Sequence, residues 1–227
     1  AIAAELRAAG GSALAVPTDV TDERSVAELL RRTYADLGPP TLLVNNAGVW
    51  RHVGPLADAV PDAWWADVEV TLRGAFLCSR AVLPGMLERA AGRIVNVSSY
   101  AAIKPQPYAT AYASGKAALL RLTDSLAAEL AGTGVTCIAV TPGFVRTDLV
   151  EGVAGSPAGR RYLPELSERD DALEPERAGA LIVAIAAGRL DALAGRFVHV
   201  LDDADELVAR ADAIAAHDAY VLRLRSL

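Results

Sequence analysis

Residues 93–120, RIVNVSSYAAIKPQPYATAYASGKAALL, contain the change of pattern that decides the fold. They begin with a short apolar run, Arg93–Val97, which is rich in β-branched residues and predicts a strand. A longer segment from about Tyr108 to Leu130 follows, and its length and residue types favour a helix. A buried strand that leads into a helix is the unit from which α/β domains are built.

The same alternation continues in both directions along the chain. Strands are predicted at Ala13–Pro17, Thr41–Asn45, Arg93–Val97, Val135–Thr141 and Arg196–Leu201. Helices are predicted at Ala1–Ala9, from Asp22 to the Gly38-Pro39-Pro40 stop, at Asp62–Glu88 with a kink at Pro84, and at Tyr108–Leu130, Pro175–Ala187 and Asp203–Leu224. The apolar runs lack a clean alternation, as in strands buried on both faces. We therefore expect an α/β fold with a doubly wound, Rossmann-like parallel sheet, in a single domain that spans residues 1–227.

One segment does not fit this alternation. Phe144–Leu173 contains Gly, Pro and several charges, and we expect it to be irregular. Loops of this length inside a compact domain are usually functional or disordered, so the segment is predicted to be a mobile lid.

The composition excludes several classes of protein. The net charge of −6 argues against nucleic acid as a partner. The two cysteines, Cys78 and Cys137, lie far apart and predict neither a disulfide framework nor a metal site. No apolar stretch reaches the roughly 20 residues that span a bilayer, and no signal peptide is visible. We expect a cytoplasmic protein without membrane contact.

Polar or glycine residues follow each of the first four predicted strands. They are Thr18-Asp19-Val20, Asn45-Asn46-Ala47-Gly48, Ser98-Ser99, and Pro142-Gly143 with Thr147. In an open parallel sheet, ligands bind outside the carboxyl ends of the strands. The same residue types are also common in ordinary turns, so each strand end taken alone leaves both interpretations open.

Tyr112 and Lys116 stand four residues apart in the predicted helix and so share one face. A free tyrosine has a pKa of about 10, too high for efficient proton exchange near neutrality. A neighbouring ammonium favours the phenolate and lowers that pKa. The spacing predicts an acid/base pair, although a surface tyrosine beside a solvated lysine would have the same spacing.

The motifs taken together resemble the short-chain dehydrogenase/reductase family in its single-domain branch. They are TDV at 18–20, NNAG at 45–48, IVNVSS at 94–99, YASGK at 112–116 and PGFVRT at 142–147. The resemblance implies catalytic roles for three residues. Tyr112 would be the general acid/base, Lys116 would lower its pKa, and Ser99 would stabilise charge on the substrate oxygen.

The resemblance also implies a nicotinamide cofactor, NAD or NADP. Asp19 and Val20 would meet its adenine, and Asn46, Ala47 and Gly48 would lie along the adenosine ribose. Tyr112 and Lys116 would contact the nicotinamide ribose. The residues near the nicotinamide carboxamide would be Pro142, Gly143, Val145 and Thr147. No metal is implied.

The chain departs from the family pattern in three places. Thr71 stands where the family usually has an Asn that holds a water in a proton relay. Leu201-Asp202-Asp203 replaces the common Asp-Gly-Gly after the last strand. The family's first strand, glycine-rich phosphate turn, helix and second strand are absent from this sequence, so the choice between NAD and NADP cannot be read from it.

The function expected from these motifs is hydride transfer between the nicotinamide and an alcohol/ketone pair. Two alternatives are a catalytically impaired binding or scaffold protein and a sugar-nucleotide epimerase or dehydratase. The expected substrate is a small alcohol or carbonyl compound whose identity the sequence does not give. Candidate pocket residues are Trp50, Tyr100, Tyr108, Phe144, Val153 and Leu163, although most of them could equally serve packing. The resemblance implies a homo-oligomer, a dimer or tetramer, paired through residues 62–88 and 108–130.

The family's strand order, 3-2-1-4-5-6-7, leads to a first prediction. In that order the absent unit supplies two central strands, and each buried unpaired backbone group costs about 1–3 kcal/mol. A chain that begins at Ala1 is therefore expected to bind no dinucleotide and to unfold without cooperativity. Isothermal titration with NADH and NADPH and a thermal melt test this, and tight binding with a sharp melt contradicts it.

Overall fold

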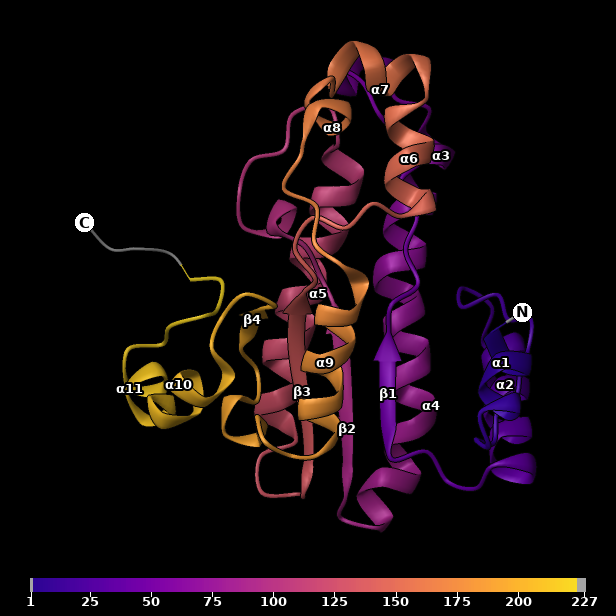
Figure 1. Cartoon of the computed structure of the whole chain (residues 1–227), viewed down its shortest axis with the longest axis vertical. Coiled ribbons are helices and arrows are strands. Elements are labelled where there is room, and N and C mark those ends of the chain that lie inside the picture. The colour runs from indigo at the N-terminus through magenta and orange to yellow at the C-terminus, as the bar shows by residue number, and fades with distance from the viewer. Residues whose placement is uncertain (1, 224–227) are drawn as a thin grey trace.

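The computed structural model describes residues 2–223, and four parallel strands form its sheet (Figure 1). They are β1 (Leu42–Asn45), β2 (Gly92–Val97), β3 (Val135–Thr141) and β4 (Phe197–His199), and they lie side by side in that order. The register pairs Val44 with Val95 and Val95 with Ile138. Because all four strands run in the same direction, their carboxyl ends share one edge of the sheet.

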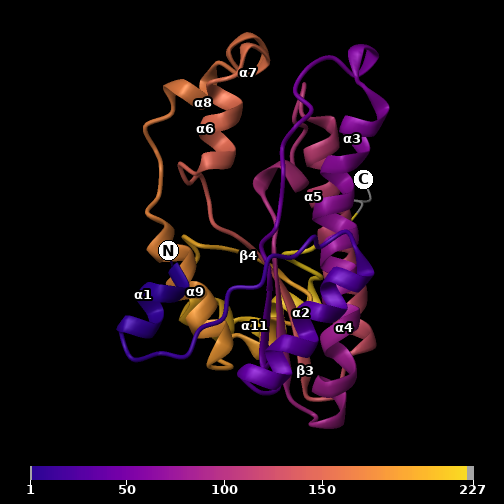
Figure 2. The same cartoon turned by 90° about the vertical axis from the view of Figure 1, so that its right-hand side faces the viewer.

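Helices cover both faces of this sheet. Their bounds are α1 Ile2–Ala8, α2 Glu23–Asp36, α3 Pro61–Val68, α4 Gly74–Glu88, α5 Thr110–Glu129, α6 Asp148–Ala154, α7 Pro157–Tyr162, α8 Glu165–Glu168, α9 Pro175–Ala186, α10 Ala204–Ala209 and α11 Ala211–Ala216. Figure 2 shows α4 and α5 on one face and α9 on the other. None of the helices in residues 2–223 is long and apolar enough to cross a membrane.

Neighbouring strand residues point into different cores, which confirms the doubly wound sheet. Ile94 packs with Met86 and Leu126 from the face of α4 and α5. Val95, the next residue along β2, packs with Leu181 and Ile185 of α9 on the opposite face. Burial on both sides explains why the strands read as continuous apolar runs in the sequence.

The helix predicted at residues 62–88 is interrupted, but not at Pro84, which lies inside α4. Instead a π-helical turn, Glu69–Arg73, separates α3 from α4. A Cβ added to Gly115 of α5 would lie 3.4 Å from Thr71 Cβ, so α5 runs very close to this turn. π-Helical turns are frequent at functional sites.

The strand predicted at Ala13–Pro17 is wrong, because residues 11–19 have no regular structure. A parallel strand is held by hydrogen bonds to a neighbour, and none of the described strands pairs with these residues. The carbonyl of Ala13 instead accepts a hydrogen bond from Arg7 Nη1 at 2.9 Å. Apolar composition favoured a strand, but pairing decides whether one forms.

The prediction that Phe144–Leu173 is irregular is wrong. It contains the short helices α6, α7 and α8, which stand above the carboxyl ends of the strands (Figure 1). Its two ends meet, because Leu173 N donates to Phe144 O at 2.7 Å. The Arg169 guanidinium lies 3.9 Å from the Phe144 ring centroid, and Arg146 Nη2 donates to Arg169 O at 2.7 Å. The segment is thus a loop with three short helices whose two ends are held together by these contacts.

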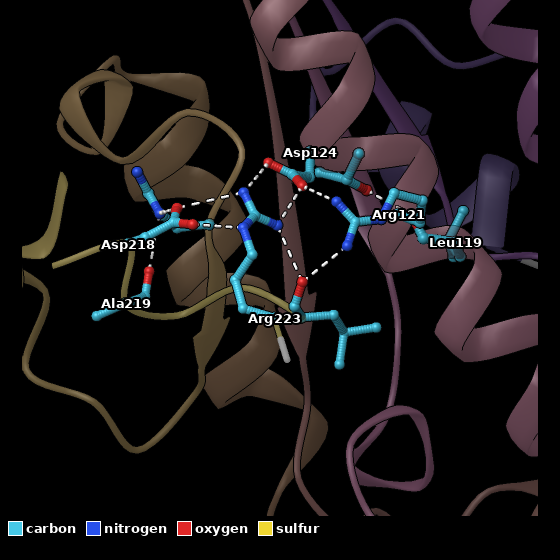
Figure 3. Close-up of polar contacts among 9 residues, drawn as sticks. Leu119, Arg121, Asp124, Asp218, Ala219 and Arg223 are labelled. Atoms are coloured by element: carbon cyan, nitrogen blue, oxygen red, sulfur yellow. Dashed lines mark hydrogen bonds and ion pairs between the residues drawn. The ribbon is translucent and has the colours of Figure 1, made fainter. Parts of the chain in front are cut away.

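The last predicted helix is also shorter than expected, since α11 ends at Ala216 and Leu224 lies outside the described residues. The chain turns after α11, with positive φ at Asp218 and Tyr220. Figure 3 shows Arg223 between Asp124 of α5 and Asp218, and its Nη1 donates to Asp124 Oδ2 at 2.7 Å. The final strand is likewise reduced to Phe197–His199 from the predicted 196–201.

Candidate active site

A cavity of about 460 Å³ opens at the carboxyl edge of the sheet, beneath α6 and α8. It is lined by Asn46, Gly48, Trp50, Val97, Ser98, Ser99, Tyr100, Ala101, Gln106, Tyr112, Lys116, Thr141, Pro142, Gly143, Phe144, Val145, Thr147, Leu149, Val150, Glu165, Leu166 and Arg169. The residues come from the ends of β1, β2 and β3, from α5 and from the segment 144–173. This is the edge of the sheet where the sequence predicted a ligand site.

Lys116 ties α5 to the end of β2. The side chain is only 5% exposed, and its Nζ donates to Val97 O at 2.7 Å. The next residue of the chain, Ser98, donates from Oγ to the backbone oxygen of Lys116 at 3.0 Å. These two bonds hold the helix and the strand end in a fixed relation.

Burial shifts the pKa of both members of the predicted pair. It lowers the pKa of Lys116 to about 8, because the ammonium loses its hydration. Burial raises the pKa of Tyr112, while the nearby Ser99 hydroxyl acts in the opposite direction. Lys116 Nζ lies 5.7 Å from the Tyr112 ring centroid. The structure therefore places three predicted site residues around one part of the cavity.

Trp50 covers the Tyr112 ring. The two rings stack with their centroids 4.6 Å apart and their planes 14° from parallel. Ser99 lies at the start of the loop after β2, where its Oγ accepts a hydrogen bond from Ala101 N at 3.2 Å. Gly48 passes close to the lysine, since a Cβ added there would lie 3.7 Å from Lys116 Nζ.

The turn after β3 forms another wall of the cavity. Gly143 has a φ of +74°, and a Cβ there would lie 2.6 Å from Leu173 Cδ1. Only glycine adopts this backbone conformation without strain and leaves room for that contact. Thr147 caps α6, with its Oγ1 accepting from Val150 N at 3.4 Å. Pro142 and Val145 line the cavity beside them.

Three predicted cofactor residues do not line this cavity. Asp19 is exposed, and its carboxylate accepts from Thr21 N at 2.9 Å and Thr21 Oγ1 at 2.7 Å, which holds its pKa below the usual value. Val20 packs in an apolar cluster with Leu77 of α4. Ala47 is exposed beside Asn46.

The predicted substrate residues also divide into two groups. Trp50, Tyr100 and Phe144 line the cavity, whereas Tyr108, Val153 and Leu163 do not. Val153 and Leu163 are buried in the cluster between the helices α6–α8 and Trp50. They help to hold the cavity wall rather than form its surface.

Sequence analysis missed a buried polar network beneath the cavity. Asn45 Nδ2 donates to Asn96 Oδ1 at 2.8 Å, and Asn96 Nδ2 donates to Thr123 Oγ1 at 2.8 Å. The network connects β1, β2 and α5, and its signal in the sequence was an asparagine in each of two apolar strands. Two charged side chains of the cavity, Glu165 and Arg169, were missed as well.

Thr71 lies in the π-helical turn against α5 and is 2% exposed. Its Oγ1 is buried and has no hydrogen-bond partner among the described residues. An unsatisfied buried hydroxyl is destabilising.

The sequence is similar to those of known short chain dehydrogenases. A family model described as short chain dehydrogenase matches residues 1–156. A short chain dehydrogenase of Pseudocercospora fijiensis is 44% identical over 147 residues, which cover 64% of this chain and 47% of the relative. A second, from Monascus purpureus, is 37% identical over 211 residues, which cover 93% of this chain and 69% of the relative. The chain thus spans about half to two thirds of the length of these relatives.

A solved structure has the same arrangement of elements. It is described as a candidate NAD(P) dependent gluconate 5-dehydrogenase from Beutenbergia cavernae with NADP bound at low occupancy. It aligns with a TM-score of 0.77 at 29% identity, over 91% of this chain and 81% of its own. Since the family model spans most of the sequence and the sheet is shared, the chain belongs to the short-chain dehydrogenase family, whose members are NAD(P)-dependent oxidoreductases.

Proposed function

We propose that the protein transfers hydride between NAD or NADP and a small alcohol or carbonyl compound, with Tyr112 as the general acid/base. The observation that carries this proposal is the convergence of Ser99, Tyr112 and Lys116 on one cavity, with Lys116 buried and bonded to Val97 O at 2.7 Å. Burial of a charged lysine is unfavourable, and such residues are common at functional sites. Here the buried ammonium lies beside a tyrosine whose phenolate form it can stabilise.

The cavity contains groups that suit the nicotinamide half of the cofactor. Lys116 can donate a hydrogen bond to the nicotinamide ribose, and Thr147 lies beside the turn that would bind the carboxamide. When bound, the nicotinamide accepts or supplies the hydride. Asp19, Val20 and Ala47 lie outside the cavity, so their proposed contacts to adenosine belong to a different part of the cofactor.

Each of the three residues has a distinct task in this mechanism. Tyr112 takes a proton from the alcohol oxygen or returns one to the carbonyl oxygen. Ser99 donates a hydrogen bond to that oxygen as negative charge develops on it. Lys116, while protonated, favours the phenolate form of Tyr112. Because the pKa of Lys116 is about 8 in the free protein, this assistance weakens as the pH rises above that value.

The walls of the cavity favour a substrate with an apolar body. Trp50, Tyr100, Phe144 and Leu166 form much of its surface, while Glu165 and Arg169 lie on the side of α8. We further propose that the segment 144–173 acts as a lid over the substrate. The proposed location is the cytoplasm, and the proposed assembly is a homodimer or homotetramer.

Replacing Tyr112 by Phe tests the proposed acid/base. The change keeps the ring that stacks on Trp50 and removes the hydroxyl, so kcat should fall by about 10²–10⁴-fold. In the complete protein, cofactor affinity, measured by titration with NADH and NADPH, should change little. Tyr34→Phe, which removes a hydroxyl from α2 far from the cavity, is the matched control. Near-full turnover of a confirmed substrate by Tyr112→Phe would show that the assignment is wrong.

Replacing Lys116 by Arg tests the buried charge. The guanidinium is larger and planar, so it cannot fill the space of the ammonium beside Val97 O, and kcat/KM should be severely reduced. Lys104→Arg, at an exposed position outside the cavity, is the control and should behave as the wild type. In the wild type, kcat/KM measured against pH should lose the contribution of the Lys116 charge above about pH 8. A kcat/KM that does not change across that pH would argue against the role of Lys116.

Replacing Thr71 by Asn tests the relay position. The family usually has an Asn at this position, which holds a water in the proton relay. Thr71→Asn should therefore leave turnover unchanged or raise it, most clearly where proton transfer limits the rate. Thr71→Val removes the unpaired hydroxyl without adding an amide, and it should melt at the same or a higher temperature. A large loss of turnover in a folded Thr71→Asn protein would contradict this interpretation.

A further inference from the structure

Trp50 occupies a place between the Tyr112 ring and the helices above the cavity. It follows the Asn45–Gly48 motif on the loop between β1 and α3. One side of the indole stacks on Tyr112, with centroids 4.6 Å apart and an angle of 14° between the planes. The indole also lines the cavity, so it is close to whatever Tyr112 reacts with.

The helices α6–α8 pack against the same indole. Trp50 and Val53 join the apolar cluster that includes Val153, Leu163 and Leu166, and Leu163 is among its most buried members. At the end of α7 the centroid of the Tyr162 ring lies 4.9 Å from the centroid of the Tyr108 ring. The segment therefore rests on the loop that carries Trp50, and the indole in that cluster also stacks on Tyr112.

The loop that carries Trp50 is anchored from below by Asp67 of α3. This carboxylate is fully buried and accepts from Arg51 N at 2.9 Å and from His52 N at 3.0 Å. Gly54 N donates to Tyr108 O at 2.8 Å. Because the backbone is fixed at three positions directly after Trp50, the indole is held against the phenol.

Polar bonding does not explain the position of this indole. Its Nε1 is buried and has no acceptor among the described residues. An unsatisfied N–H opposes such burial, so the stacking of the flat rings must outweigh it. A phenyl ring should then serve the same purpose as the indole, whereas a branched aliphatic side chain should not.

We propose that Trp50 is a positioning residue for Tyr112, which shields the phenol from water and conveys to it the packing of α6–α8. The proposal rests on the function proposed for Tyr112. While the segment packs on the indole, Trp50 covers one face of the Tyr112 ring and keeps water from it. Loss of the stack admits water, which stabilises the phenolate and lowers the pKa of Tyr112.

Few other titratable groups face this phenol. Lys116 lies on the same helix, with its ammonium on Val97 O. Glu165 and Arg169 line the cavity from the side of α8, and Arg169 is paired with Asp171 at 2.7 Å. Asp67 lies behind the loop and binds only its backbone. Trp50→Leu adds or removes no charge among these groups, so a shift in the titration of Tyr112 reports on the cover by the indole.

The test follows the phenolate of Tyr112 directly, by ultraviolet difference absorbance between each variant and the same variant with Tyr112→Phe. Trp50→Leu should lower the titration midpoint by about one pH unit or more, or reveal phenolate at a pH where the wild type shows none. Trp50→Phe should keep the wild-type titration and melt at the same or a higher temperature. Trp65→Leu, which removes a 58% exposed indole from α3, is the matched control and should leave the titration unchanged.

A second pair of variants tests the link to the segment above. Leu163→Ala should shift the titration in the same direction as Trp50→Leu, and the double variant should shift no further than the larger single effect. The proposal is overturned if folded Trp50→Leu titrates as the wild type, if Trp50→Phe shifts as far as Trp50→Leu, or if Leu163→Ala has no effect. Because no substrate is used, an unchanged kcat in Tyr112→Phe would reject the proposed function without deciding this result.

Discussion

The bond from the Lys116 ammonium to the carbonyl of Val97 is the contact on which the candidate site depends. It joins the first turns of α5 to the last residue of β2, and Ser98 completes the link by donating to the Lys116 carbonyl. Lys116 is 5% exposed, and a single carbonyl oxygen offsets only part of the hydration that its ammonium loses. The part of the desolvation that this bond does not offset lowers the pKa of Lys116 to about 8. The charge of Lys116 therefore depends on whether its neighbour is a phenol or a phenolate.

This contact requires a parallel sheet. With all strands in one direction, the chain leaves β1, β2 and β3 at the same edge, and α5 returns along one face to bring Tyr112 there. The Asn45–Asn96–Thr123 network fixes the relation between two strands and α5 from inside the core. Buried polar groups of this kind are tolerated because each finds a partner, and they make other registers costly.

The upper wall of the cavity has a different physical basis. The segment 144–173 contributes apolar side chains that pack on Trp50, and its ends are joined by the Leu173–Phe144 hydrogen bond of 2.7 Å. None of the described strands includes or pairs with its residues, so its position depends largely on side-chain packing. Elements of that kind are the ones that open at low free energy in proteins. Trp50 is where this wall and the phenol of Tyr112 meet.

The sequence by itself determined the class of fold and four of the strands, because apolar periodicity is a local property. Helical spacing also predicted that Tyr112 and Lys116 share one face of a helix, whereas Ser99 was named only through the resemblance to the family. It did not determine the strand at Ala13–Pro17, because a strand exists only with a hydrogen-bonded neighbour. It also could not show that Trp50 covers Tyr112, that Asp67 anchors the Trp50 loop, or that Asp19 and Val20 lie outside the cavity. Those relations join residues that are distant in the chain, and only tertiary packing brings them together or keeps them apart.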